Sequence, residues 1–320
     1  MFEQPPKRDA VSNEKKSPQL DPEVERHLEA IDFGRIRELF TEKIQGLGLD
    51  PEKNMKSFVG QKSKFRNISL LDRLRGGRAS YRMSDKSIGI DPKLVQKAEN
   101  ADSESEQDRG DLLLGRICHE ETHAVSFQEL TIEKESWRKK KASKQIGYEQ
   151  YKIELNFLSV SDENLFNALN EGVTDLIGQE VFTDYLQKKE KAYSRYQSAY
   201  YKERDLVLFL SIEIAHECGL DRKILWKVMQ RGYFAGEDLV GEKMEKLFQN
   251  IFPNQFKKLV AEFKHSDSRK NLNEIEELWK KTIWTDADKK RVRRWVLSVY
   301  HAMPKEVSDP SASAEPSQRY

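Results

Sequence analysis

The stretch "ICHEETHAV", residues 117–125, constrains this chain more than any other, because it places His119 and His123 four residues apart. On a helix, residues at this spacing lie on one face about one turn from each other. Two imidazoles at that separation can reach one tetrahedral zinc ion at about 2.0–2.1 Å. The alternative is an ordinary helix on which two of the chain's 6 histidines share a face without a ligand.

Glu120 directly follows the first histidine, so we expect its carboxylate to lie beside a metal ion and not on it. From there it reaches a zinc-bound water, whose pKa the metal lowers to near 7. The glutamate takes the proton of this water as the hydroxide attacks a carbonyl, and then passes the proton to the leaving amine. The pentapeptide therefore predicts a catalytic centre with one Zn²⁺ ion and Glu120 as its general base.

A catalytic zinc site needs a third protein ligand and an open position for water. In "NALNEGVTDLIGQEV", Glu171 and Asp175 are four residues apart and share a helical face. Glu171 can bind zinc, while Asp175 can hold the free N–H of a ligand histidine. An equally open alternative makes Glu171 an acid that complements a helix N-terminus and Asp175 a surface acid.

"HEETH" followed by "NEGVTD" resembles the gluzincin branch of zinc metallopeptidases, to which thermolysin belongs. The resemblance implies an α+β fold with a zincin-like core and an extended substrate that pairs with a sheet edge, formed by "SIGID" or "ASYRM". It implies that the zinc ligands are His119, His123 and Glu171. It also implies that Glu120 is the general base and that Asp175 orients a motif histidine.

Two features depart from the pattern of this family. Position 121 is usually uncharged, and for Glu121 we expect either exposure to solvent or a pair with a neighbour such as Arg116. Residues 124–170 separate the two motifs by far more than in thermolysin, which predicts an inserted lid or hairpin. Its basic run "WRKKKASK", residues 137–144, is typical of a solvated loop or helix face and not of a nucleic-acid patch.

The oxyanion of a tetrahedral intermediate needs a hydrogen-bond donor besides zinc. Tyr200 and Tyr201 follow the second motif, and the resemblance to related peptidases makes either one a candidate catalytic residue. An aromatic helix face packed into the core is the more ordinary explanation. His216 is another candidate donor, although its apolar surroundings favour a core or helix-cap position, and we expect Cys118 to be buried and inert.

Apolar periodicity divides the chain into four parts. Residues 1–20 and 304–320 are predicted to be disordered tails. Residues 21–160 form a mixed α+β subdomain, in which a helix begins at Asp111, two short strands surround a turn at 84–86, and residues 91–98 open another helix. Residues 161–303 form a helical subdomain with the third zinc ligand, including a helix capped by Thr285.

The composition of the chain argues against nucleic acid and a membrane span as partners. With 55 basic and 54 acidic residues the net charge is +1, which gives no general attraction to nucleic acid. No apolar run is long enough for a membrane span, no secretory signal is recognisable, and 2 cysteines suit a reducing cytoplasm. We therefore expect a cytoplasmic zinc metallopeptidase that acts on a peptide or protein. The alternative is a zinc-binding, proteolytically inactive interaction protein, and the oligomeric state stays open.

Overall fold

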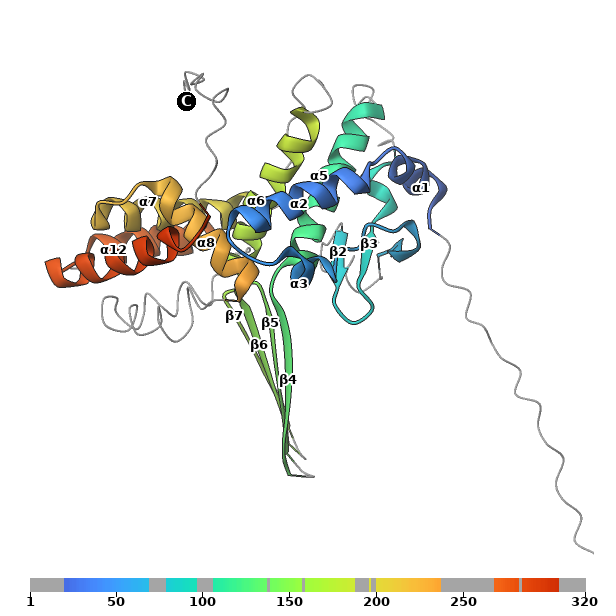
Figure 1. Ribbon diagram of the computed structural model, residues 1–320. Helices are drawn as coiled ribbons and strands as arrows, with labels where there is room; N and C mark the ends of the chain where they lie inside the picture. Colours follow the sequence, from blue (N-terminus) through green and yellow to red (C-terminus); the bar gives the residue numbers. More distant parts are fainter. Residues whose placement is uncertain are drawn as a thin grey trace, which may run out of the picture.

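The computed structural model describes residues 20–68, 79–96, 106–136, 139–156, 159–187, 196, 200–236, 268–281 and 284–304. The predicted tails lie outside this part of the chain, apart from their innermost residues. Within it the chain combines many helices with two separate sheets, which confirms the expected α+β class (Figure 1).

Two long helices, α5 (Glu106–Val125) and α6 (Asn167–Gln187), pack against each other and carry the two sequence motifs. They approach closely at Gly178, where an added Cβ would lie only 3.2 Å from the backbone nitrogen and Cα of His119. The missing side chain therefore lets α6 lie directly on the backbone of α5. The start of α5 precedes the predicted start at Asp111 by more than one turn.

A small sheet lies beside α5 and consists of β1 (Phe65–Asn67), β2 (Ala79–Arg82) and β3 (Ser87–Ile90). The order is β1-β3-β2, with β1 parallel and β2 antiparallel to β3. The two strands predicted around the turn at 84–86 are therefore confirmed. Because β3 is paired on both sides, "SIGID" is not a sheet edge, whereas β2, with "ASYRM", is one of the two outer strands among those described. Of the helix predicted at 91–98, the structure describes residues 91–96, which contain one short 3₁₀ turn, η2 (Pro92–Leu94).

Further helices surround this centre. Near the N-terminus they are α1 (Pro22–Glu29), α2 (Phe33–Gly46) and α3 (Pro51–Met55), each capped by a preceding aspartate whose side chain accepts a backbone N–H. A single 3₁₀ turn, η1 (Lys62–Lys64), leads into β1. After α6 they are α7 (Tyr201–Cys218), α8 (Arg222–Ala235), α11 (Ser268–Lys280) and α12 (Asp286–His301). Thr285 caps α12 as predicted, because its hydroxyl accepts the N–H of Asp288.

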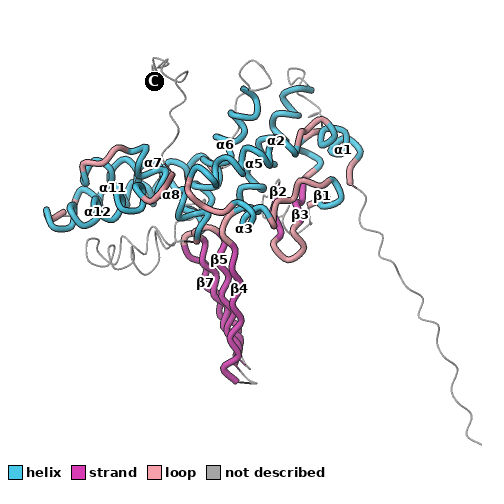
Figure 2. The backbone as a smooth tube through the Cα atoms, viewed as in Figure 1, coloured by secondary structure: helices cyan, strands magenta, loops and turns pink. Residues whose placement is uncertain are grey.

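The segment between the two motifs forms a second, four-stranded antiparallel sheet that extends away from the helical body (Figures 1 and 2). Its strands are β4 (Gln128–Ser136), β5 (Lys139–Ile146), β6 (Glu149–Asn156) and β7 (Ser159–Leu165). A hairpin at Gly147, which has a φ of 53°, joins β5 to β6 and bears out the predicted insertion of a hairpin. Most of the basic run lies on β5, so the expectation of a loop or helix face was wrong.

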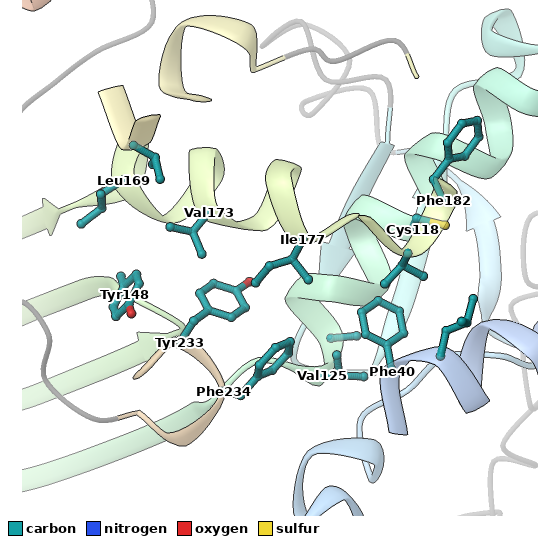
Figure 3. Packing of buried hydrophobic residues seen from close by; sticks show 14 of the residues in the cluster. Phe40, Cys118, Val125, Tyr148, Leu169, Val173, Ile177, Phe182, Tyr233 and Phe234 are labelled. Atoms are coloured by element: carbon teal, nitrogen blue, oxygen red, sulfur yellow. The ribbon is translucent and has the colours of Figure 1, made fainter. Parts of the chain in front are cut away.

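The core lies where α5, α6 and α8 meet, and α2 closes it from another side. Figure 3 shows Tyr233 and Phe234 of α8 close to Ile177 of α6, with Phe40 of α2 beside Val125 of α5. The hydroxyl of Tyr148 donates to the carbonyl of Met229, which ties the base of the long sheet to α8. In the part of the chain that the structure describes, no helix combines the length and apolar character that crossing a bilayer requires.

Candidate metal centre

Three potential ligands converge between α5 and α6. The Nε2 atoms of His119 and His123 lie 3.2 and 3.3 Å from the same carboxylate oxygen of Glu171. All three ligand atoms lie within 4.8 Å of one another. Two ligands bound to one tetrahedral zinc ion at about 2.0–2.1 Å are roughly 3.3–3.4 Å apart. The two histidine–carboxylate distances therefore fit a zinc ion without any rearrangement of the helices.

The ring of His119 is oriented by Asp175, as the sequence suggested. Its Nδ1 lies 3.3 Å from a carboxylate oxygen of Asp175, and both side chains are buried. The same carboxylate accepts a 3.0 Å hydrogen bond from the hydroxyl of Tyr196, and Nη1 of Arg204 lies 3.7 Å from its other oxygen. A proton on Nδ1 facing this carboxylate leaves the lone pair of Nε2 for a metal ion.

A threonine that was not predicted orients the ring of His123. The hydroxyl of Thr174 donates to the carbonyl of Asn170 at 2.8 Å and lies 3.4 Å from Nδ1 of His123. Because its own hydrogen is used, this hydroxyl accepts from Nδ1, which again frees Nε2 for a metal. Tyr233 supports the threonine from the core at 2.7 Å. The signal in the sequence was the spacing of Thr174 three residues after Glu171, on the same helical face.

The charges at this point favour a bound cation. Burial alone lowers the pKa of His119, but hydrogen bonds to Asp175 and Glu171 outweigh burial and raise the pKa to about 10. Burial raises the pKa of Glu171, but the two histidines outweigh it and hold that pKa well below its usual range. The carboxylates thus retain positive charge on the imidazole of His119, and a divalent cation would supply positive charge directly.

Glu120 lies beside the three potential ligands, as predicted. Its side chain is buried, and its carboxylate accepts a 2.6 Å hydrogen bond from the backbone N–H of Tyr81 on β2. Together with two of the ligands it borders a cavity of about 180 Å³. The cavity is lined by Ala79, Ser80, Tyr81, Glu120, His123, Lys144, Ile146, Glu149, Glu171 and Tyr200.

Glu121 faces away from the ligands, and both expectations for it were wrong. It is fully buried, and its two carboxylate oxygens accept the backbone N–H groups of Val59 and Gly60 at 2.9 and 3.0 Å. Burial raises the pKa of Glu121 to about 8, although these two donors act in the opposite direction. The residue therefore ties α5 to the segment that precedes β1. A sequence pattern does not reveal such a role, because the partners are backbone groups.

Of the two candidate tyrosines, only Tyr200 lies at the cavity. Tyr200 borders the cavity, and its ring stacks on His119 with centroids 4.8 Å apart and planes at 10°. The negative charge of Glu171 and burial raise the pKa of Tyr200 well above its usual value, so the phenol stays protonated and able to donate. Tyr201, the first residue of α7, is 55% exposed and does not line the cavity.

Two other residues singled out from the sequence lie away from the cavity. His216 is exposed in the last turn of α7, where its carbonyl accepts the N–H of Gly219, so the helix-cap position fits it, whereas a buried core position and a donor role do not. Cys118 is fully buried, as predicted, and burial raises the pKa of its thiol far above the usual value.

Comparisons with known proteins add no assignment to this geometry: no family model, no curated protein and no solved structure matches the chain.

Proposed function

We propose that this protein is a zinc-dependent peptidase of the zincin type, which hydrolyses peptide bonds through a metal-activated water. The observation that carries the proposal is the convergence of two histidines and Glu171 beside the carboxylate of Glu120, at the wall of a cavity. Second-layer partners support the same conclusion, since each histidine has an acceptor at Nδ1 that directs Nε2 toward Glu171. The resemblance of the two motifs to gluzincins agrees with this chemistry.

His119, His123 and Glu171 would hold the zinc ion. When bound, zinc supplies a water of lowered pKa and polarises the substrate carbonyl. Glu120 would act as the general base that takes up a water proton and returns it to the leaving amine, and the N–H of Tyr81 holds its carboxylate in place. The protonated hydroxyl of Tyr200 donates to the carbonyl oxygen as negative charge develops there.

Strand β2 supplies a backbone partner for the substrate. Ala79, Ser80 and Tyr81 line the cavity, and β2 is an outer strand of its sheet among the described residues. An extended peptide paired along this edge would bring a scissile bond past the ligands.

The separating experiment measures zinc content and hydrolysis of a mixed peptide library for the wild type and Glu120→Gln. We expect about one zinc ion per chain in both proteins, and hydrolysis that falls about 10²–10⁴-fold in the variant. Glu129→Gln, which changes an exposed glutamate at the start of β4, is the matched control and should leave both readouts unchanged. Zinc retained without hydrolysis in the wild type would refute the peptidase proposal. Zinc affinity left intact by Glu171→Ala would refute the ligand assignment.

A further inference from the structure

The long four-stranded sheet forms part of the wall of the cavity. Lys144 and Ile146 of β5 line the cavity, as does Glu149 of β6. The strand register pairs Lys144 with Leu130 and Ile146 with Gln128, and directly opposed residues lie on one face of a sheet. The face that borders the cavity therefore continues along the sheet as the face that carries Leu130.

Two large apolar side chains follow on this same face. By alternation along β4 they are Leu130 and Ile132. The opposite face carries Thr131, which pairs with Ser143 of β5, and both of these side chains are exposed. This part of the sheet therefore has an apolar and a polar face, and the sheet extends away from the helical body (Figures 1 and 2). We call the side that carries Leu130 and Ile132 the docking face.

The docking face is open where its side chains are described. Leu130 is 57% exposed and Ile132 is 66% exposed. Neighbouring large apolar side chains that remain in water on an extended surface mark a site of interaction. Because this face begins at the cavity and continues outward from it, a polypeptide bound in the cavity could extend along it.

We propose, on the basis of the proposed peptidase function, that the docking face binds an extended, unfolded polypeptide substrate beyond the bond that is cut. A nine-residue strand such as β4 spans roughly 30 Å, so it matches a substrate segment of about nine residues. The apolar residues supply affinity for apolar side chains, and Lys144, at the junction with the cavity, supplies one positive charge. The substrate class is therefore an unfolded protein chain and not a free short peptide.

The test measures binding of fluorescently labelled β-casein, an unfolded protein, by anisotropy to zinc-loaded Glu120→Gln protein, in which the bound chain stays intact. Leu130→Ser combined with Ile132→Ser should raise the Kd about tenfold, equivalent to about 1.4 kcal/mol. Glu129→Ser combined with Thr131→Ser, on the other face of the same strand, is the matched control and should leave the Kd unchanged. In the active background, hydrolysis of β-casein should fall with the first pair, while hydrolysis of a blocked tetrapeptide should not.

Equal Kd values for the two double variants, with thermal unfolding unchanged, would overturn the proposal. It would also be overturned if the apolar-face variant lost binding to phosphatidylserine–phosphatidylcholine vesicles but bound β-casein normally, because the partner would then be a membrane. Failure of the wild type to cut either substrate would refute the proposed function. Binding of β-casein to the Glu120→Gln protein is measured without catalysis, so the two failures are distinguishable.

Discussion

Replacing Gly172 by alanine tests how closely α6 and α7 must pack to complete the site. An added Cβ would lie 2.7 Å from the carbonyl carbon of Glu203 and from Cγ2 of Val207, and closer still to the Glu203 carbonyl oxygen. Ordinary Cβ contacts begin near 3.4 Å, so the first turn of α7 must retreat by at least about 0.7 Å. Tyr200 immediately precedes α7, so its ring would move with that turn and lose its stacking on His119.

Two opposing effects determine how Gly172→Ala changes the free energy of unfolding. Overpacking against backbone atoms that cannot rotate away costs about 1–3 kcal/mol. Alanine offsets part of this cost, because it is more favourable than glycine in a helix by about 1 kcal/mol. We therefore expect Gly172→Ala to lower the free energy of unfolding by up to about 2 kcal/mol and the Tm by up to about 8 °C. Peptide hydrolysis should fall more than zinc content, because the ligands stay on α5 and α6.

Alanine substitutions at two other glycines serve as references for the stability of the Gly172→Ala variant. At Gly46, the last residue of α2, a Cβ would meet nothing within 4 Å, so alanine should be neutral or stabilising by up to about 1 kcal/mol. At Gly178 the Cβ would lie 3.2 Å from the backbone of His119, so the effect should fall between the other two. Calorimetry of the zinc-loaded variants gives the order directly. A Gly172→Ala protein as stable as Gly46→Ala would refute the reasoning.

Two further substitutions address the buried carboxylates. Asp175→Asn removes the charge that faces Nδ1 of His119, and the zinc affinity measured by chelator competition should fall about 10–100-fold; an unchanged affinity would contradict the orienting role. Glu121→Ala leaves one buried and one partly buried backbone N–H group without their acceptor, at about 1–3 kcal/mol each, so urea denaturation at pH 7 should show a loss of about 2–6 kcal/mol. Glu129→Ala at an exposed position should change the free energy of unfolding by less than about 0.5 kcal/mol, and a similarly small effect of Glu121→Ala would show that the buried bonds are dispensable.

Helical spacing predicted which residues meet, because it is a local geometric rule. His119 and His123 share a face of α5, and Glu171 and Asp175 share a face of α6, as the four-residue intervals required. The contact between these two helix faces is not a local property of the sequence. It depends on Gly178, which lets α6 pack directly against α5.

The long sheet was only partly predictable, for the opposite reason. Five of the eight residues in "WRKKKASK" are basic, and charge dominates any pattern of alternation there. Lys141 and Ala142 belong to a strand because they pair with Glu133 and Ile132 on one side and with Glu154 and Ile153 on the other. Strand propensity depends on such neighbours, which are absent from a local window of sequence.

The adjacent glutamates of "HEETH" bind two different parts of the chain, both distant in sequence. Successive helical residues point about 100° apart, so Glu120 and Glu121 cannot serve the same partner. Glu120 accepts the N–H of Tyr81 on β2, while Glu121 accepts the N–H groups of Val59 and Gly60 ahead of β1. Helix α5 is therefore bonded both to β2 and to the segment that precedes β1. The bond from Tyr81 to Glu120 is the one that joins β2 to the helix of the two histidines. A substrate paired with β2 would have to match the separation that this bond helps to fix.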